Sequence, residues 1–270
     1  MFFHTQLFAV LVIIVSAVLA AIGLLITRRL MNQKTLKESH DVGGYLLSVI
    51  GTLFAVLLGL VVVDAMQSYQ RARDIVERES NCLTDVLILS DRLPEPRRSK
   101  VRNMCADYAD QVVDTEWSQM SCASYCPIAR EKAISLMQAL MDFEPKTENE
   151  KALYPQMVQE ASEFWQNREA RINIARTGLP ALEWTALIAG AVITVFFTYF
   201  FVLESLAMQL AMTVMVAFLV SLNMMLLLMY AYPFSGDLSL GNDSFQAIQE
   251  IMQTVKDPPP GEIKKDKRKH

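Results

Sequence analysis

The chain has 270 residues, of which 52% are hydrophobic and 20% charged, and its mean hydropathy is +0.24. Its formal net charge of -4 argues against a nucleic-acid partner, and its hydropathy argues against a single soluble domain. The apolar residues gather in four windows, each longer than the roughly 18 residues that a membrane-spanning helix needs. These windows are Leu7–Thr27, Gly43–Ala65, Leu179–Val202 and Leu206–Tyr230.

We therefore predict an all-α integral membrane protein with four transmembrane helices and a helical cytoplasmic domain inserted between the second and third. The predicted boundaries are 1–65 for the first transmembrane pair, 66–178 for the polar domain and 179–231 for the second pair. A loop, an amphipathic helix and a basic tail occupy 232–270.

Positively charged residues near the membrane ends predict the orientation. Four lie between the first two spans, whereas six flank the polar domain within the roughly 15–20 residues over which positive charge sets topology. The four are Arg28, Arg29, Lys34 and Lys37, and the six are Arg71, Arg73, Arg78, Arg168, Arg171 and Arg176. This excess places the polar domain and both termini in the cytoplasm.

The second span has no helix-breaking residue where it leaves the apolar window. No Pro or Gly occurs from Val61 to Asn81, so we expect one helix to continue from the membrane into water as far as Ser90. Its "QRARDIVERE" segment alternates in charge, which is typical of a solvated helix face. We expect Glu77 or Glu79 to pair with Arg73 or a neighbouring subunit, each pair contributing on the order of 0–1 kcal/mol.

The rest of the polar domain also has helical periodicity. Apolar residues between Val101 and Val113 recur at helical spacing, "SQMSCASYCP" is predicted to be a loop, and further helices are expected at Ile128–Phe143 and Glu150–Thr177. After the fourth span comes an amphipathic helix. Its apolar face is predicted to contain Phe245, Ile248, Ile251, Met252 and Val255.

The second span carries a stripe of small, weakly polar residues on an otherwise Leu- and Val-rich helix. Ser48, Thr52, Ala55 and Gly59 recur at one helical face. Such a stripe gains nothing from lipid, but its hydroxyl groups suit the wall of a pore. Close packing against another helix favours the same small residues, so both interpretations stay open.

Two polar residues within the spans are further candidates. Asp64 lies at the membrane edge, where ionisable groups tend to face protein or water, and a ring of such aspartates would favour cations. The alternative interpretation is that Asp64 lies among the lipid headgroups, near Arg71 or Arg73. Asn223 lies in the middle of the fourth span, and we expect it to bond another helix rather than a substrate.

No metal, cofactor or catalytic set is predicted. Cys122 and Cys126 form half of a zinc-binding pattern without a second half, and Cys82 and Cys105 fall in apolar helical patterns typical of free buried thiols. The sequence contains no phosphate-binding loop, zinc-protease motif or nucleophile elbow, so we predict that the protein is not an enzyme.

Four segments in order resemble the bestrophin-like family of bacterial membrane proteins, which is distantly related to the bestrophin anion channels. They are "SYQRARDIVERESNCLTDVLIL", "LPEPRRSKVRNMCADYADQVVDTEW", "NREARINIARTGLPALEW" and "YPFSGDLSLGNDSF". The resemblance implies an inner-membrane location, cytoplasmic termini and a ring-shaped homo-oligomer, five-membered in bestrophins. It also implies that the second helix of each subunit lines the pore.

The same resemblance places the narrow neck of the pore near Ser48, Thr52 and Val56. In bestrophins the neck is apolar and often aromatic, whereas here only Val56 is apolar and none is aromatic. The combined prediction is an oligomeric channel that passes small ions, with anions favoured by the resemblance. The alternative is a non-conducting membrane scaffold or sensor whose helical domain binds a partner.

Overall fold

The computed structural model describes residues 5–30, 40–201, 203 and 205–256. The described residues are helical or lie in turns and loops, and no strand occurs among them. The chain divides into two compact units. The first unit comprises Met1–Gln70 and Thr177–Ser239, and the second comprises Arg71–Arg176 and Leu240–His270.

The first unit contains the helices that are long and apolar enough to cross a membrane. They are α1 (Thr5–Leu30), the first part of α3 (His40–Ser90), α8 (Ala181–Phe197) with the short helix η2 (Thr198–Phe200), and α9 (Leu206–Ala231). Only 11% to 22% of each apolar window is buried inside the chain. Most of the apolar side chains therefore face outward, toward lipid or other protein chains.

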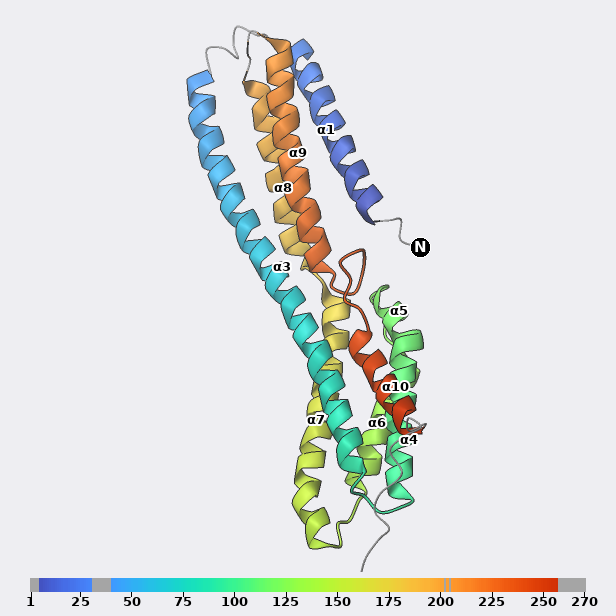
Figure 1. Cartoon of the computed structure of the whole chain (residues 1–270). Coiled ribbons are helices and arrows are strands. Elements are labelled where there is room, and N and C mark those ends of the chain that lie inside the picture. The colour runs from blue at the N-terminus through green and yellow to red at the C-terminus, as the bar shows by residue number, and fades with distance from the viewer. Residues whose placement is uncertain (1–4, 31–39, 202, 204, 257–270) are drawn as a thin grey trace, which may run out of the picture. The chain divides into compact units, whose positions relative to one another are not determined.

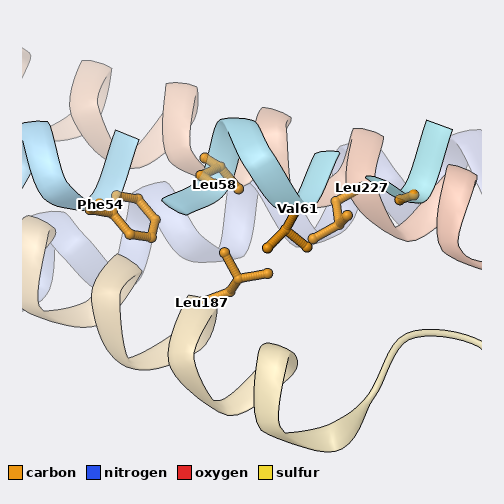
Figure 2. Close-up of a cluster of buried hydrophobic side chains, with 6 residues drawn as sticks. Phe54, Leu58, Val61, Leu187 and Leu227 are labelled. Carbon is orange, nitrogen blue, oxygen red and sulfur yellow. The ribbon is translucent and has the colours of Figure 1, made fainter. Parts of the chain in front are cut away.

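A small apolar cluster joins α3 to α8 and α9, as Figure 2 shows. One face of α3 supplies Phe54, Leu58, Val61 and Ala65, at the three- and four-residue spacing that places side chains on one side of a helix. Leu187 of α8 and Leu227 of α9 complete the cluster, and neither is exposed. This cluster fixes which face of α3 is turned toward its own chain.

Helices α1, α8 and α9 run side by side (Figure 1). The hydroxyl groups of Ser16 and Ser221 hydrogen-bond between α1 and α9 at 2.5 Å. A Cβ added at Gly23 of α1 would lie 2.6 Å from the hydroxyl oxygen of Tyr199 in η2. Glycine is therefore what lets α1 approach the aromatic ring so closely.

Helix α3 is a single helix of 51 residues, drawn without interruption in Figure 1. It begins at His40, contributes to the apolar cluster of the first unit, and ends at Ser90 in the second. This confirms the prediction that the second span continues to Ser90. The absence of Pro and Gly from Val61 to Asn81 is the local reason.

The second unit is a helical assembly built around α3 and α7. Its other elements are α4 (Arg97–Gln111), the π-helix η1 (Val112–Glu116), α5 (Trp117–Met120), α6 (Pro127–Met141) and α10 (Asp243–Lys256), while α7 covers Glu148–Thr177. The predicted loop "SQMSCASYCP" is wrong at its start, because α5 extends to Met120. Met120 is 1% exposed, so burial keeps this turn helical.

Helix α10 packs against α4 with the apolar face that the sequence predicts. Phe245, Ile248 and Met252 are buried, whereas Ile251 is 41% exposed and lies at the edge of that face. The side chain of Val255 lies outside the described residues. Two hydrogen bonds also hold the start of α10 and the residues before it. Trp117 Nε1 donates to the carbonyl of Leu240 at 3.0 Å, and Ser80 Oγ donates to the carbonyl of Ser244 at 2.7 Å.

Two helical glycines in the first unit provide a matched test of the packing. A Cβ at Gly190 would lie 2.8 Å from Cε2 of Phe54, whereas none of the surrounding heavy atoms comes within 4 Å of one at Gly59. We expect Gly190→Ala to destabilise the fold by about 1–3 kcal/mol through overpacking. Gly59→Ala should be neutral or slightly stabilising, because alanine favours a helix. Thermal unfolding in detergent measures both, and equal midpoints would contradict the packing described.

Candidate functional site: the open face of α3 and a buried ion cluster

The small residues of α3 lie on a different side of the helix from its packed face, with the centres of the two faces about 120° apart. An α-helix turns about 100° per residue, so Thr52 lies roughly 160° around the axis from Phe54. Ser48, Thr52, Ala55 and Gly59 fall within about 60° of one another on the same geometry. All four are exposed in the chain, as is Val56.

This open face is not in contact with another described helix of the chain. No surrounding heavy atom lies within 4 Å of where a Cβ of Gly59 would be. The hydroxyl of Thr52 donates to the carbonyl of Ser48, one turn back, at 2.7 Å. Packing within the chain therefore does not account for the small residues, among the residues that the structure describes.

Asp64 is exposed but points in a different direction from the stripe. It lies about 120° around the helix from Thr52 and about 140° from Gly59. Asn223 of α9 is also exposed, and its side-chain amide donates to the carbonyl of Leu219 in its own helix at 2.9 Å. Within the chain, Asn223 therefore bonds its own helix and not another helix as expected.

The second unit contains a buried ion cluster, which we define as Glu79, Glu116, Arg168 and Arg171 with Tyr108. Each of the five is at most 1% exposed. Arg171 of α7 binds Glu79 of α3 with two parallel hydrogen bonds, Nε to Oε2 at 2.6 Å and Nη2 to Oε1 at 3.0 Å. This two-point geometry is the strongest that a guanidinium and a carboxylate can adopt.

The second half of the ion cluster comes from η1. Glu116 accepts from Nη2 of Arg171 at 3.1 Å and from Nη2 of Arg168 at 3.1 Å. Glu116 is the last residue of the π-helix, whose wider turn changes the register between α4 and α5. Two guanidinium groups and two carboxylates balance in charge, which lowers the free-energy cost of burying the whole set.

Aromatic rings and a phenol enclose the ion cluster. The guanidinium carbon of Arg171 lies 5.6 Å from the ring centres of both Trp117 and Phe245. Tyr108 donates its hydroxyl to Oε1 of Glu79 at 2.5 Å. Burial, and then the Glu79 carboxylate, raise the pKa of Tyr108 well above its usual value, so the phenol remains a donor.

Arg171 keeps its charge despite complete burial. Burial alone lowers its pKa, but Glu79, Tyr108 and Glu116 together outweigh that effect, and the pKa of Arg171 is raised. The ion cluster joins α3, η1 and α7. It offers no free group for catalysis, and its chemistry is that of a structural connection.

Comparisons with known proteins place the chain in a family. A family model described as the bestrophin-like domain matches residues 14–245, most of the chain. The chain belongs to the bestrophin-like family. A comparison with curated protein sequences gave no significant match.

Solved structures share the bestrophin-like fold at low sequence identity. A bacterial bestrophin homologue from Klebsiella pneumoniae, carrying one substitution, is 12% identical with a TM-score of 0.67; the likeness covers 91% of this chain and 99% of that one. A second structure of a bestrophin homologue from the same organism is 14% identical with a TM-score of 0.68, covering 92% and 100%. Together with the four apolar helices, the family identifies a membrane protein.

The predicted surface ion pair of Arg73 with Glu77 or Glu79 is confirmed for Glu77, whose Oε1 accepts from Nε of Arg73 at 3.1 Å. The surface alternative is wrong for Glu79, which is fully buried in this bestrophin-like chain. The missed signal is periodicity: Glu79 lies three residues after Val76 and four before Leu83, both buried. A charged residue in the apolar register of a helix indicates a buried partner.

Glu77 and Glu79 therefore provide a matched pair for a stability test. We expect Glu79→Gln to lower the free energy of unfolding by about 3–5 kcal/mol, because it leaves Arg171 buried without its main counter-charge. Glu77→Gln should cost no more than about 1 kcal/mol, because its ion pair is exposed. Denaturant titration of the purified protein measures both, and similar losses for the two variants would contradict the burial of Glu79.

Proposed function

We propose that the protein is an oligomeric ion channel of the inner membrane in which α3 of each subunit lines the pore. The observation that supports this most is the open face of α3. Its small and hydroxyl-bearing residues are exposed and lie on a different side of α3 from the apolar cluster. Several copies arranged around an axis would bring these faces together.

The physical reason for this arrangement is solvation. A serine or threonine hydroxyl turned toward lipid can bond only a carbonyl of its own helix, as Thr52 does, whereas in a water-filled pore it also helps replace the water shell of an ion. Ser48 and Thr52 supply the hydroxyl groups, and Ala55, Val56 and Gly59 leave room beside them. The packed face, about 120° around the helix, holds Phe54, Leu58 and Val61 against the chain itself.

A homo-oligomer is required because one α3 cannot enclose a path. The low burial of all four apolar windows leaves the surface that both neighbouring subunits and the lipid bilayer would cover. A ring of subunits, five as in the bestrophins that the sequence resembles, meets this requirement. Small ions are then the transported partners.

We propose anions as the conducted species, on the strength of the family relationship to bestrophin anion channels. Asp64 lies roughly 120° around the helix from Thr52, so it is off the proposed lining. The lining then carries no formal negative charge that would repel anions.

We also propose that both termini and the helical domain lie in the cytoplasm. The six-to-four distribution of positive charge near the membrane ends predicts this orientation.

Flux through reconstituted liposomes tests this proposal. We expect the wild-type protein to conduct chloride and Thr52→Trp to reduce that flux by at least about tenfold, because the indole would fill the path. Leu53→Trp is the matched control, since Leu53 is equally exposed but lies about 100° around the helix from Thr52. Its flux should stay near the wild-type value.

Two results would contradict the proposal. Absence of flux from a correctly assembled oligomer would favour the scaffold alternative, especially if a partner protein co-purifies through residues 66–178. Equal loss of flux from Thr52→Trp and Leu53→Trp would show that the stripe does not line the path. Subunit counting of the purified protein adds a further condition, because a monomer or dimer is too small to form the ring.

A further inference from the structure

A second set of interacting side chains joins α3 to α7, separate from the buried ion cluster. The Sγ of Cys82 and carboxylate oxygens of Glu160 and Glu163 all lie within 4.8 Å of one another. Cys82 is 6% exposed, Glu160 is half-buried and Glu163 is exposed. Three potential metal ligands of two chemical kinds thus converge from two helices.

The sequence positions make this convergence possible. Glu160 and Glu163 are three residues apart on α7, so both carboxylates lie on one face of that helix. Cys82 lies one turn after Glu79 on α3, on the same buried side. The ion pair between Glu79 and Arg171 holds the same two helices together, and on α7 Glu160 and Glu163 lie two to three turns before Arg171.

The set has an excess of acidic groups. Burial, and then the neighbouring Glu160, raise the pKa of Cys82 to about 12. Burial, and then Asp85, raise the pKa of Glu160 as well. Among the described residues no Lys or Arg forms an ion pair with Cys82, Asp85, Glu160 or Glu163. The Cys82 thiol hydrogen-bonds the Glu160 carboxylate, and Gln159 Nε2 donates to Oε1 of Glu163 at 2.9 Å. A bound divalent cation would supply the positive charge that the set lacks.

We propose that Cys82, Glu160 and Glu163 bind a zinc-class divalent cation that links α3 to α7. The mixed donor set selects this class, since a thiolate is a soft ligand that zinc accepts and that calcium and magnesium avoid. Three protein ligands leave a fourth position for water. Ligand atoms on one zinc ion lie about 3.5 Å apart, so the side chains would close by roughly 1 Å on binding.

Metal binding at this site releases protons. The thiol of Cys82 loses its proton to solvent as the sulfur–metal bond forms, and any proton on Glu160 is released in the same way. No redox change occurs. The cation then offsets two of the three negative charges of the thiolate and the two carboxylates, which reduces the repulsion among them.

Cobalt is the direct probe, because a thiolate bound to Co²⁺ produces a charge-transfer absorption band that carboxylates alone do not. The full-length protein in detergent is stripped with a chelator and titrated with Co²⁺. We expect the band in wild-type protein and in Cys122→Ser, the matched control at an exposed cysteine. Cys82→Ser should abolish the band, and Zn²⁺ but not Ca²⁺ or Mg²⁺ should displace the Co²⁺.

Glu163→Gln guards against a folding defect in the cysteine variant, because Glu163 is exposed and its loss leaves the core intact. We expect it to weaken Zn²⁺ affinity at least about tenfold. Its control is Glu148→Gln, an exposed position on the same helix. Absence of the band in wild-type protein, its persistence in Cys82→Ser, or unchanged affinity in Glu163→Gln would overturn the site. None of these readouts depends on ion conduction.

Discussion

The pairing of Glu79 with Arg171 is the interaction on which the second unit depends. It joins the last part of α3 to α7. The ion pairs of Glu116 with Arg168 and Arg171 extend this connection to η1. Burying four charges costs several kcal/mol each in lost hydration, which the two-point geometry and the aromatic enclosure offset. Apolar side chains of similar volume could stabilise the same core. The distinctive contribution of an ionic set is directional, because the two-point bond between Arg171 and Glu79 forms only when α3 and α7 are correctly aligned.

This alignment matters because α3 belongs to both units. Its first part presents small residues on an open face and packs through Phe54, Leu58 and Val61, while its last part enters the buried ion cluster. In the proposed channel, the helix that lines the path is thus the helix that the second unit holds. The proposed metal site lies one turn further along the same helix, between the same two elements. A substitution in the buried ion cluster or at the proposed metal site would therefore act on α3 itself.

Features that depend on local sequence were predictable. The four spans, the continuous helix to Ser90 and the buried residues Phe245, Ile248 and Met252 follow from hydropathy and helical spacing alone. The ion cluster was not predictable, because Glu79 and Arg171 are 92 residues apart and the alternating charges around Glu79 are typical of a solvated helix face. The apolar register around Glu79 indicates burial but not the partner. The convergence of Cys82 with Glu160 and Glu163 has no motif spacing, since it depends on how two helices meet.

A double-mutant cycle between Glu79 and Arg171 tests the importance of this connection most directly. Glu79→Leu, Arg171→Met and the double variant would be unfolded with denaturant and followed by tryptophan fluorescence, with Trp117 beside the Arg171 guanidinium as reporter. We expect each single variant to lose about 3–5 kcal/mol and the double variant to lose no more than the worse single, a coupling of at least about 3 kcal/mol. Additive losses would show that the two residues act independently and would contradict a connection between α3 and α7 built on their pairing.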